Sequence, residues 1–327
     1  MSTKTAARAK SSNVQVTTKP TVFIDGEAGT TGLEIRRRLA AVTGVKVESI
    51  TADKRKDEAA RLAMMREADL VVLCLPDEAA KAAVAIIGSL GDGAPKVVDA
   101  SSAHRVADGW VYGWPEMDAG QAQAIKGARR VTNPGCYPTG AIALIRPLVE
   151  AGLLPVDHPV TVNAVSGYSG GGRTMIEAHE AGSAPAFELY GLGLEHKHVP
   201  ELHKYSKLAR RPIFVPSVGN FRQGMLVCVP LYLDALAGKP KARDLEAALA
   251  RHYAGARLVK VVPADDGSAK GGRLDALALN DTDMLELRVF ANENHRQAVL
   301  VARLDNLGKG AAGAAVQNIG LMLGVAT

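Results

Sequence analysis

The stretch TVFIDGEAGTTGLEI, residues 21–35, decides the fold. A short apolar, β-branched run passes through a glycine-rich turn into a segment whose apolar residues have helical spacing. Glycines at such a junction allow a tight turn and let backbone N–H groups approach a pyrophosphate, which rests on the helix N-terminus. The turn therefore predicts a dinucleotide-binding site. Its predicted contacts are Gly26, Gly29, Thr30, Thr31 and Gly32.

Strands and helices alternate after this stretch. Apolar runs at 45–52, 69–76 and 96–101 predict strands, and the segments between them have helical spacing. Two of the strands are apolar on both faces, which is typical of a parallel sheet covered by helices on both sides. We therefore predict an α/β fold with a doubly wound parallel sheet of the Rossmann type.

The pattern changes in the second half of the chain, where longer strands are separated by few helices. This predicts an α+β domain with a mostly antiparallel or mixed sheet. The last segment returns to helical spacing, and we expect it to pack on the first domain. The predicted division is a disordered tail at 1–20, a nucleotide domain at 21–137 and 306–327, and a second domain at 138–305.

Composition excludes several classes of protein. The chain has 327 residues and a net charge of +5, but only 4% aromatic residues and dispersed cations, which argues against a nucleic-acid partner. No apolar run is long enough to span a membrane. Three cysteines at irregular spacing favour a reducing compartment, so we expect a cytoplasmic protein. A mild positive charge suits anionic small substrates.

The segment after the second strand bears on the cofactor. It carries three consecutive cations, Lys54, Arg55 and Lys56, which favour the 2′-phosphate of NADP, although a solvated basic loop would have the same composition. Two further segments, DASSAHRV at 99–106 and NLGKGAAGAAVQN at 306–318, are also expected at the cofactor, although the second could instead serve tight helix packing against the first domain. The contacts predicted there are Ser101, Lys309, Gly310 and Asn318.

One cysteine differs from the other two. Cys74 and Cys228 lie among aliphatic residues with strand character and resemble small buried hydrophobic side chains. Cys136, in VTNPGCYPTG, follows a strand and precedes Pro138, a residue favoured in the first turn of a helix. A helix N-terminus stabilises a thiolate, so Cys136 is the candidate nucleophile.

A thiol nucleophile needs an acid/base partner, and the densest histidine cluster is HKHVPE, residues 196–201. His196 and His198 are expected in a loop at the start of a helix. The same pair could ligate a metal, but no third and fourth ligand follow at a recognisable spacing, and we predict no metal. Arg105 is expected to clamp an anion, and Ser166, Ser169 and Arg173 lie in a loop rich in donors, SGYSGGGR.

Taken together, FIDGEAGTTGLEI, DASSAHRVADGWVYGWPE, NPGCYPTGAIALIRP, SGYSGGGR, HKHVPEL and NLGKGAAGAAVQN resemble the N-acetyl-gamma-glutamyl-phosphate reductases in their shorter form. The resemblance covers roughly residues 21–325. It implies an NADP-binding Rossmann domain joined to a glyceraldehyde-3-phosphate-dehydrogenase-like α+β domain. It also implies reduction of N-acetylglutamyl 5-phosphate to the 5-semialdehyde, with release of inorganic phosphate.

Roles come with this resemblance. Cys136 matches the family nucleophile and His196 the acid/base histidine, while Arg105, Tyr190, His198 and Glu201 match supporting positions. A homodimer or homotetramer is implied as well. The alternatives are another acyl-phosphate reductase (aspartate-semialdehyde dehydrogenase or an aminoadipyl-phosphate reductase), a non-catalytic NADP-binding protein, and a metal-dependent hydrolase that uses HKH.

Overall fold

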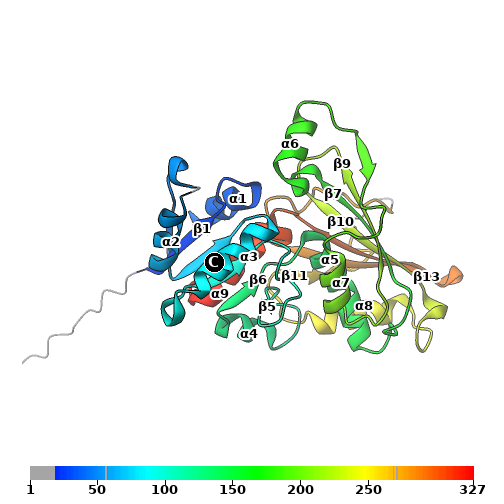
Figure 1. Ribbon diagram of the computed structural model, residues 1–327. Helices are drawn as coiled ribbons and strands as arrows, with labels where there is room; N and C mark the ends of the chain where they lie inside the picture. Colours follow the sequence, from blue (N-terminus) through cyan, green and yellow to red (C-terminus); the bar gives the residue numbers. More distant parts are fainter. Residues whose placement is uncertain (1–18, 56, 268, 270–271) are drawn as a thin grey trace, which may run out of the picture.

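The chain folds into two sheets that lie side by side (Figure 1). This computed structural model describes residues 19–55, 57–267, 269 and 272–327. All but the last two residues of the predicted tail lie outside the described residues, and so does Lys56.

The first sheet has six strands in the order β2-β1-β3-β4-β6-β5, and every pairing is parallel. Its strands are β1 (Thr21–Asp25), β2 (Lys46–Glu48), β3 (Leu70–Leu73), β4 (Lys96–Asp99), β5 (Val111–Tyr112) and β6 (Arg130–Thr132). Its helices are α1 (Thr30–Leu39), α2 (Glu58–Glu67), α3 (Asp77–Gly88), α4 (Gln121–Gly127) and α9 (Gly313–Leu323).

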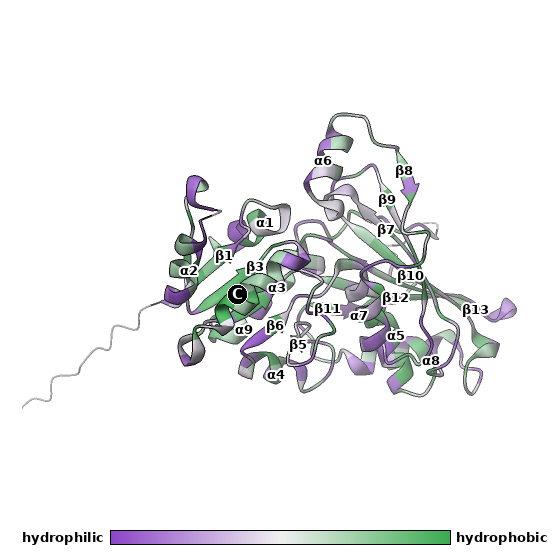
Figure 2. Cartoon of the chain, in the orientation of Figure 1, coloured by the Kyte–Doolittle hydropathy of each residue, from purple (hydrophilic) through white to green (hydrophobic). Residues whose placement is uncertain are grey.

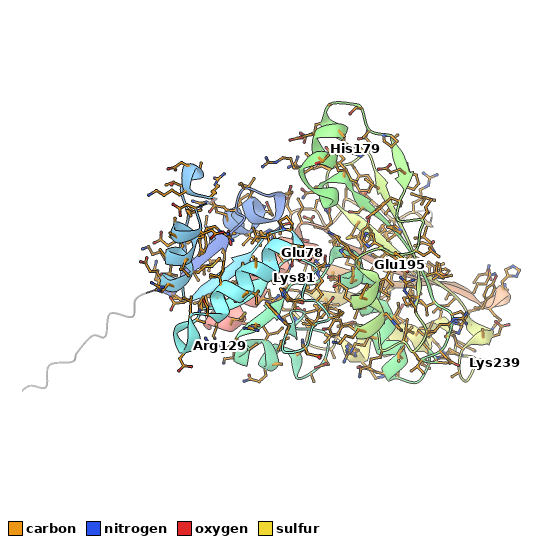
Figure 3. The ribbon with its side chains drawn as sticks, viewed as in Figure 1. Glu78, Lys81, Arg129, His179, Glu195 and Lys239 are labelled. Carbon is orange, nitrogen blue, oxygen red and sulfur yellow. The ribbon has the colours of Figure 1, made fainter. Side chains whose placement is uncertain are left out.

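Both faces of this sheet are buried, as the sequence predicts. Val22 and Ile24 of β1 belong to an apolar cluster that includes residues of α1, α4 and α9. Phe23, between them, belongs to a second cluster, formed with residues of α2 and α3. Strands β1 and β3 of the sheet are coloured hydrophobic in Figure 2. On α3, Glu78 and Lys81 form an ion pair on the outer surface (Figure 3). The predicted doubly wound sheet is confirmed.

The second sheet has seven strands in the order β11-β12-β13-β10-β7-β9-β8 and is mixed, as predicted. Its strands are β7 (Thr161–Gly167), β8 (Phe187–Leu189), β9 (Ile213–Gly219), β10 (Met225–Tyr232), β11 (Val259–Val261), β12 (Leu285–Asn292) and β13 (Gln297–Leu304). Helices α5 (Cys136–Glu150), α7 (Val199–Tyr205) and α8 (Ala242–His252) pack on it, while α6 (Gly172–Glu180) lies near α1.

Two details differ from the predicted elements. The strand expected at 45–52 ends at Glu48, where its pairing with β1 stops, and the hydroxyl of the next residue, Ser49, donates a hydrogen bond to the carboxylate of Glu27. The C-terminal segment begins with a π-helical turn at Gly308–Ala312 and continues as α9. Helix α9 packs on the first sheet, as expected, and the division of the chain into domains stays a prediction.

Candidate active site

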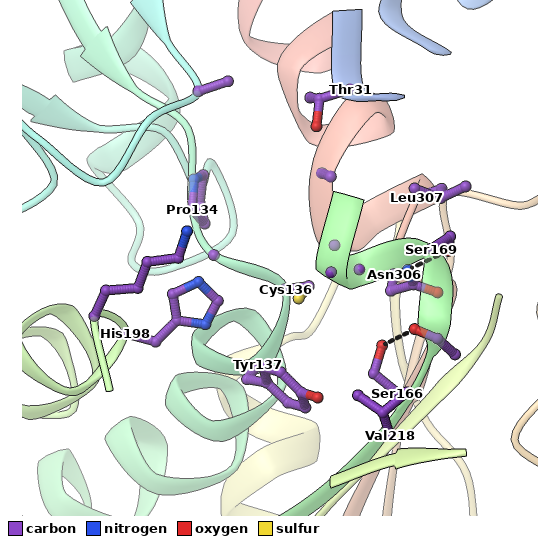
Figure 4. A pocket seen from close by; sticks show the side chains of 18 of the residues that line it. Thr31, Pro134, Cys136, Tyr137, Ser166, Ser169, His198, Val218, Asn306 and Leu307 are labelled. Carbon is purple, nitrogen blue, oxygen red and sulfur yellow. Dashed lines mark hydrogen bonds between the residues drawn. The ribbon is translucent and has the colours of Figure 1, made fainter. Parts of the chain in front are cut away.

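A cavity of about 280 Å³ lies between the two sheets, and most of the predicted catalytic residues line it (Figure 4). Its walls come from segments far apart in the sequence: the loop after β4, the start of α5, the loops around β7 and α7, and the π-helical turn. The predicted residues that line it are Thr31, Arg105, Cys136, Ser166, Tyr190, His196, His198 and Gly310.

Cys136 is the first residue of α5, and Gly135 before it is the N-cap, with an extended backbone. The predicted position at a helix N-terminus is therefore confirmed. The thiol is half-buried, and burial raises its pKa to about 11. The charge of Arg105 and the backbone N–H groups of Tyr137 and Cys136 lower the pKa by less. Burial thus outweighs the helix N-terminus, and the Cys136 thiol is protonated at neutral pH.

Glu201 holds the start of α5 in place. Its carboxylate accepts hydrogen bonds from the Arg105 guanidinium, from the hydroxyl of Tyr112 at 2.9 Å and from the backbone N–H of Gly135 at 3.0 Å. Arg105 and Glu201 are both buried, so the pair is shielded from solvent. Arg105 also donates from Nε to the carbonyl oxygen of Asn133 at 3.1 Å. The two side chains form a rigid wall beside the thiol.

Gly135 is required by this packing. A Cβ atom at this position would lie 2.6 Å from Arg105 Nη1, 2.7 Å from Glu201 Oε1 and 2.8 Å from His198 Nε2. Gly310 faces Cys136 from the other side, and a Cβ atom there would lie 2.9 Å from Cys136 Cβ. Backbone without side chains therefore leaves room on both sides of the thiol.

The two histidines have different environments. His196 Nδ1 accepts a hydrogen bond from the backbone N–H of His198 at 3.1 Å, so the ring proton of neutral His196 is on Nε2. Burial, with smaller contributions from Lys197 and Arg105, lowers the pKa of His196 to about 4. His198 is buried, its pKa is also lowered by burial, and its Nδ1 has no hydrogen-bond partner among the described residues. Both imidazoles are neutral at pH 7.

Tyr190 and Ser166 complete the wall formed by the second sheet. The Tyr190 hydroxyl donates to the Tyr137 hydroxyl at 3.2 Å, which in turn donates to the carbonyl oxygen of Ser217 at 3.0 Å. Ser166 is buried and donates to the carbonyl oxygen of Gly167 at 3.1 Å.

The loop between β1 and α1 lines a second cavity, of about 270 Å³, which shares Thr31 and Ala100 with the first. Gly26 has a φ of +88°, and a Cβ atom there would lie 2.3 Å from the carbonyl oxygen of Cys74. A Cβ atom on Gly32 would lie 2.7 Å from Glu27 Cα. The loop therefore packs tightly at the N-terminus of α1, as a pyrophosphate cradle requires, and the residues present fit a dinucleotide.

The other predicted cofactor contacts lie in varied places. Lys54 ends a short 3₁₀ turn at Ala52–Lys54, and Arg55 follows it; both are exposed. Ser101 is buried and its hydroxyl donates to Asp99 at 2.8 Å.

Cys74, interpreted from the sequence as a strand residue, lies just after β3 and lines the cradle cavity, and Cys228 is half-buried on β10.

Lys309 and Asn318 differ from the prediction, because their side chains make internal contacts. The Lys309 ammonium is fully buried and donates to both carboxylate oxygens of Glu116 at 2.8 Å and to Gln317 at 2.7 Å. Asn318 is fully buried and donates to the carbonyl oxygen of Gly113 at 2.8 Å. Neither side chain lines the cavities described above.

Sequence reasoning missed three residues that hold the site together. Tyr112 binds Glu201, Asn133 donates to the carbonyl oxygen of Ala311 at 2.9 Å, and Asn306 donates to the Ser169 hydroxyl at 2.9 Å. Asn133 and Asn306 stand at the start of two glycine-containing motifs, NPG and NLG, which was the available signal. Tyr112 carried none.

Neither a metal-binding cluster nor a membrane-spanning helix occurs in the described ranges. Within them, no group of three or more His, Cys, Asp or Glu side chains could hold a metal ion. No helix in the described part of the chain is both long and apolar enough to cross a membrane.

The fold and the site together define the class of semialdehyde dehydrogenases. Residues 21–126 match the family model "Semialdehyde dehydrogenase, NAD binding domain", and residues 136–306 match "Semialdehyde dehydrogenase, dimerisation domain". Among solved structures, aspartate semialdehyde dehydrogenase from Francisella tularensis has a TM-score of 0.70 at 13% identity, covering 92% of this chain and 99% of that one. Aspartate semialdehyde dehydrogenase II from Vibrio cholerae has a TM-score of 0.68 at 15% identity, covering 94% and 99%. These likenesses show the fold.

Sequence similarity identifies the family within this class. The chain is 53% identical over 311 residues to N-acetyl-gamma-glutamyl-phosphate reductases from Brucella ovis and Brucella canis, a match that covers 94% of this chain and 99% of each relative. The chain belongs to the N-acetyl-gamma-glutamyl-phosphate reductase family. The resemblance inferred from the sequence motifs is thereby confirmed, as is a domain of the kind that binds nicotinamide dinucleotides.

Proposed function

We propose that this protein reduces N-acetyl-L-glutamyl 5-phosphate to N-acetyl-L-glutamate 5-semialdehyde with NADPH, a step of arginine biosynthesis, through a thioester on Cys136. The observation that carries the proposal is the cavity that joins the Cys136 thiol to Arg105 and His196 and shares Thr31 and Ala100 with the neighbouring cavity at the α1 cradle. An acyl carbon bound in this cavity lies within reach of both the thiol and a dinucleotide in the cradle.

The reaction begins at the thiol. The Cys136 sulfur attacks the acyl carbon, its proton passes to an oxygen of the substrate phosphate, the tetrahedral adduct loses hydrogen phosphate, and a thioester remains. Arg105, whose positive charge already lowers the thiol pKa, stabilises the developing thiolate.

The bound cofactor supplies the hydride that reduces the thioester carbonyl. The residues that would hold it are the glycines and threonines of the β1–α1 loop, with Lys54 and Arg55 at the 2′-phosphate. His196 bears its proton on Nε2, which suits donation to an oxyanion rather than abstraction of a proton. Collapse of the thiohemiacetal then expels the Cys136 sulfur and frees the aldehyde.

The proposal includes assembly and location. The proposal keeps two domains, one formed by residues 21–137 and 306–327 and the other by residues 138–305. The second domain joins copies of the chain into a homodimer or homotetramer. The protein is located in the cytoplasm. The support is an apolar hollow of about 570 Å³ on the second sheet, lined by Pro230, Tyr232 and Val299. Tyr232 and Val299 are exposed in the single chain. Light scattering on the purified protein measures the number of copies.

The direct test runs the reaction in reverse, as phosphate-dependent reduction of NADP with different semialdehydes. N-acetylglutamate semialdehyde is expected to be the best substrate, ahead of aspartate semialdehyde and aminoadipate semialdehyde on its carrier protein. Cys136→Ser is expected to retain NADPH binding and lose turnover by orders of magnitude, because a hydroxyl of ordinary pKa is a poor nucleophile. Preference for another semialdehyde would redirect the substrate assignment, and NADPH binding without turnover on any of them would favour a non-catalytic binding protein.

A further inference from the structure

Arg173 reaches from the second half of the chain to the cradle of the first sheet. It lies in the first turn of α6, and its Nη2 atom donates a hydrogen bond to the carbonyl oxygen of Ala28 at 2.8 Å. Ala28 is in the glycine-rich loop between β1 and α1, 145 residues earlier in the sequence. None of the roles described above, at the cofactor or at the thiol, accounts for this hydrogen bond.

The cavity at the cradle is almost without charge. Its walls are formed by Gly29, Thr30, Thr31, Gly32, Cys74, Leu75, Ala100, Gly172 and Arg173. Arg173 is the one charged residue among these lining residues. A pyrophosphate carries two negative charges, and the N-terminus of α1 offers only backbone N–H groups and a partial positive charge. A full positive charge from the opposite wall would complete the site.

We propose that Arg173 binds the pyrophosphate of the dinucleotide and so joins the second sheet to the cofactor. This rests on the proposed NADPH binding. A guanidinium has five N–H donors, and the bond to Ala28 uses one, which leaves donors free for two phosphate oxygens. The contact with Ala28 holds the side chain beside the cradle before the cofactor arrives, which reduces the entropy lost on binding.

The position of Arg173 also links the cofactor to the thiol. The segment that ends at Arg173 begins at Ser166, and Ser166, Ser169 and Gly170 line the cavity around Cys136. A cofactor that engages Arg173 therefore restrains the loop that forms one wall of that cavity. In this way cofactor binding sets the shape of the acyl site.

The test compares two ligands on three variants. NADPH contains the pyrophosphate, whereas adenosine 2′-monophosphate retains only the adenosine and the 2′-phosphate. For Arg173→Gln we expect NADPH binding, followed by the fluorescence of the reduced nicotinamide, to weaken about tenfold, which corresponds to ~1.4 kcal/mol. Binding of adenosine 2′-monophosphate, followed by calorimetry, should be unchanged. Arg173→Lys should fall between the parent and Arg173→Gln.

The matched control is Arg222→Gln. Arg222 is another arginine near α6, but its side chain pairs with Glu180, and it lines a neighbouring cavity that Arg173 also lines rather than the cradle cavity itself. Its substitution should leave both ligands unaffected. If Arg173→Gln binds NADPH within about twofold of the parent, or weakens both ligands equally, the role of Arg173 is wrong. A parent protein that binds no NADPH would overturn the proposed function and this inference together.

Discussion

At the scale of single residues, the Cys136 thiol is subject to opposing effects. Burial raises its pKa, and the Arg105 charge and the N–H groups at the start of α5 lower it. Since burial is the largest of these, the thiol is a weaker nucleophile in the free protein than its place at a helix N-terminus indicates.

This balance predicts the pH dependence of alkylation. With a pKa of about 11, the thiolate fraction of Cys136 increases about tenfold per pH unit through the neutral and mildly alkaline range. We expect the rate of carbamidomethylation by iodoacetamide to increase in the same way from pH 7 to 10 without levelling off. Quenched samples analysed by mass spectrometry assign the modification to Cys136.

Two comparisons make this measurement decisive. A free cysteine peptide, with a thiol pKa of about 8.5, should level off within the same range. Cys74, whose pKa burial raises to about 12, should react no faster than Cys136 at any pH. A plateau for Cys136 below pH 8 would mean that the helix N-terminus and Arg105 outweigh burial, contrary to this account.

At the scale of elements, the start of α5 depends on the residue before it, Gly135, having no side chain. A Cβ atom on Gly135 would meet Arg105, Glu201 and His198 at 2.6 to 2.8 Å. Gly135→Ala is therefore expected to separate the Arg105–Glu201 pair, displace the thiol and reduce kcat by at least about tenfold, with a loss of ~1–3 kcal/mol in unfolding free energy. Steady-state kinetics and urea denaturation measure the two effects.

Gly127→Ala is the matched control for this substitution. Gly127 ends α4, and an added Cβ atom there has no heavy atom within 4 Å. Both kcat and unfolding free energy should stay close to those of the parent. Full activity in Gly135→Ala would show that the wall of the cavity yields without cost, and would remove the packing argument for this glycine.

The same scale shows what the sequence can predict. The Gly26 and Gly135 motifs are local, since a strand, a turn and a helix follow one another along the chain, and both were placed correctly. The strand predicted at 45–52 was too long, because its pairing with β1 stops at Glu48, and the Ser49 hydroxyl that follows contacts the carboxylate of Glu27. Local composition does not contain that contact.

At the scale of the whole molecule, the unpredicted features are long-range pairs. Tyr112 and Glu201 are 89 residues apart, and Lys309 and Glu116 are 193 residues apart. Nothing near Lys309 in the sequence names a buried partner, and a lysine in a glycine-rich motif before a helix predicts a cofactor contact. The burial of Lys309 depends on the packing of the C-terminal helix on the first sheet, which is a long-range contact that the local sequence does not contain.

The Lys309–Glu116 pair yields a prediction about stability. The ammonium is fully buried, and burial lowers its pKa against the opposing effect of Glu116, so either charge alone would be costly to bury. Lys309→Met and Glu116→Gln are each expected to lose ~3–5 kcal/mol in unfolding free energy, whereas the double variant should recover most of the loss because no charge remains. Urea denaturation at pH 7 measures all three. If the two losses simply add in the double variant, the two groups do not interact. The π-helical turn, which carries Lys309 and places Gly310 against Cys136, would then be held in place by other contacts.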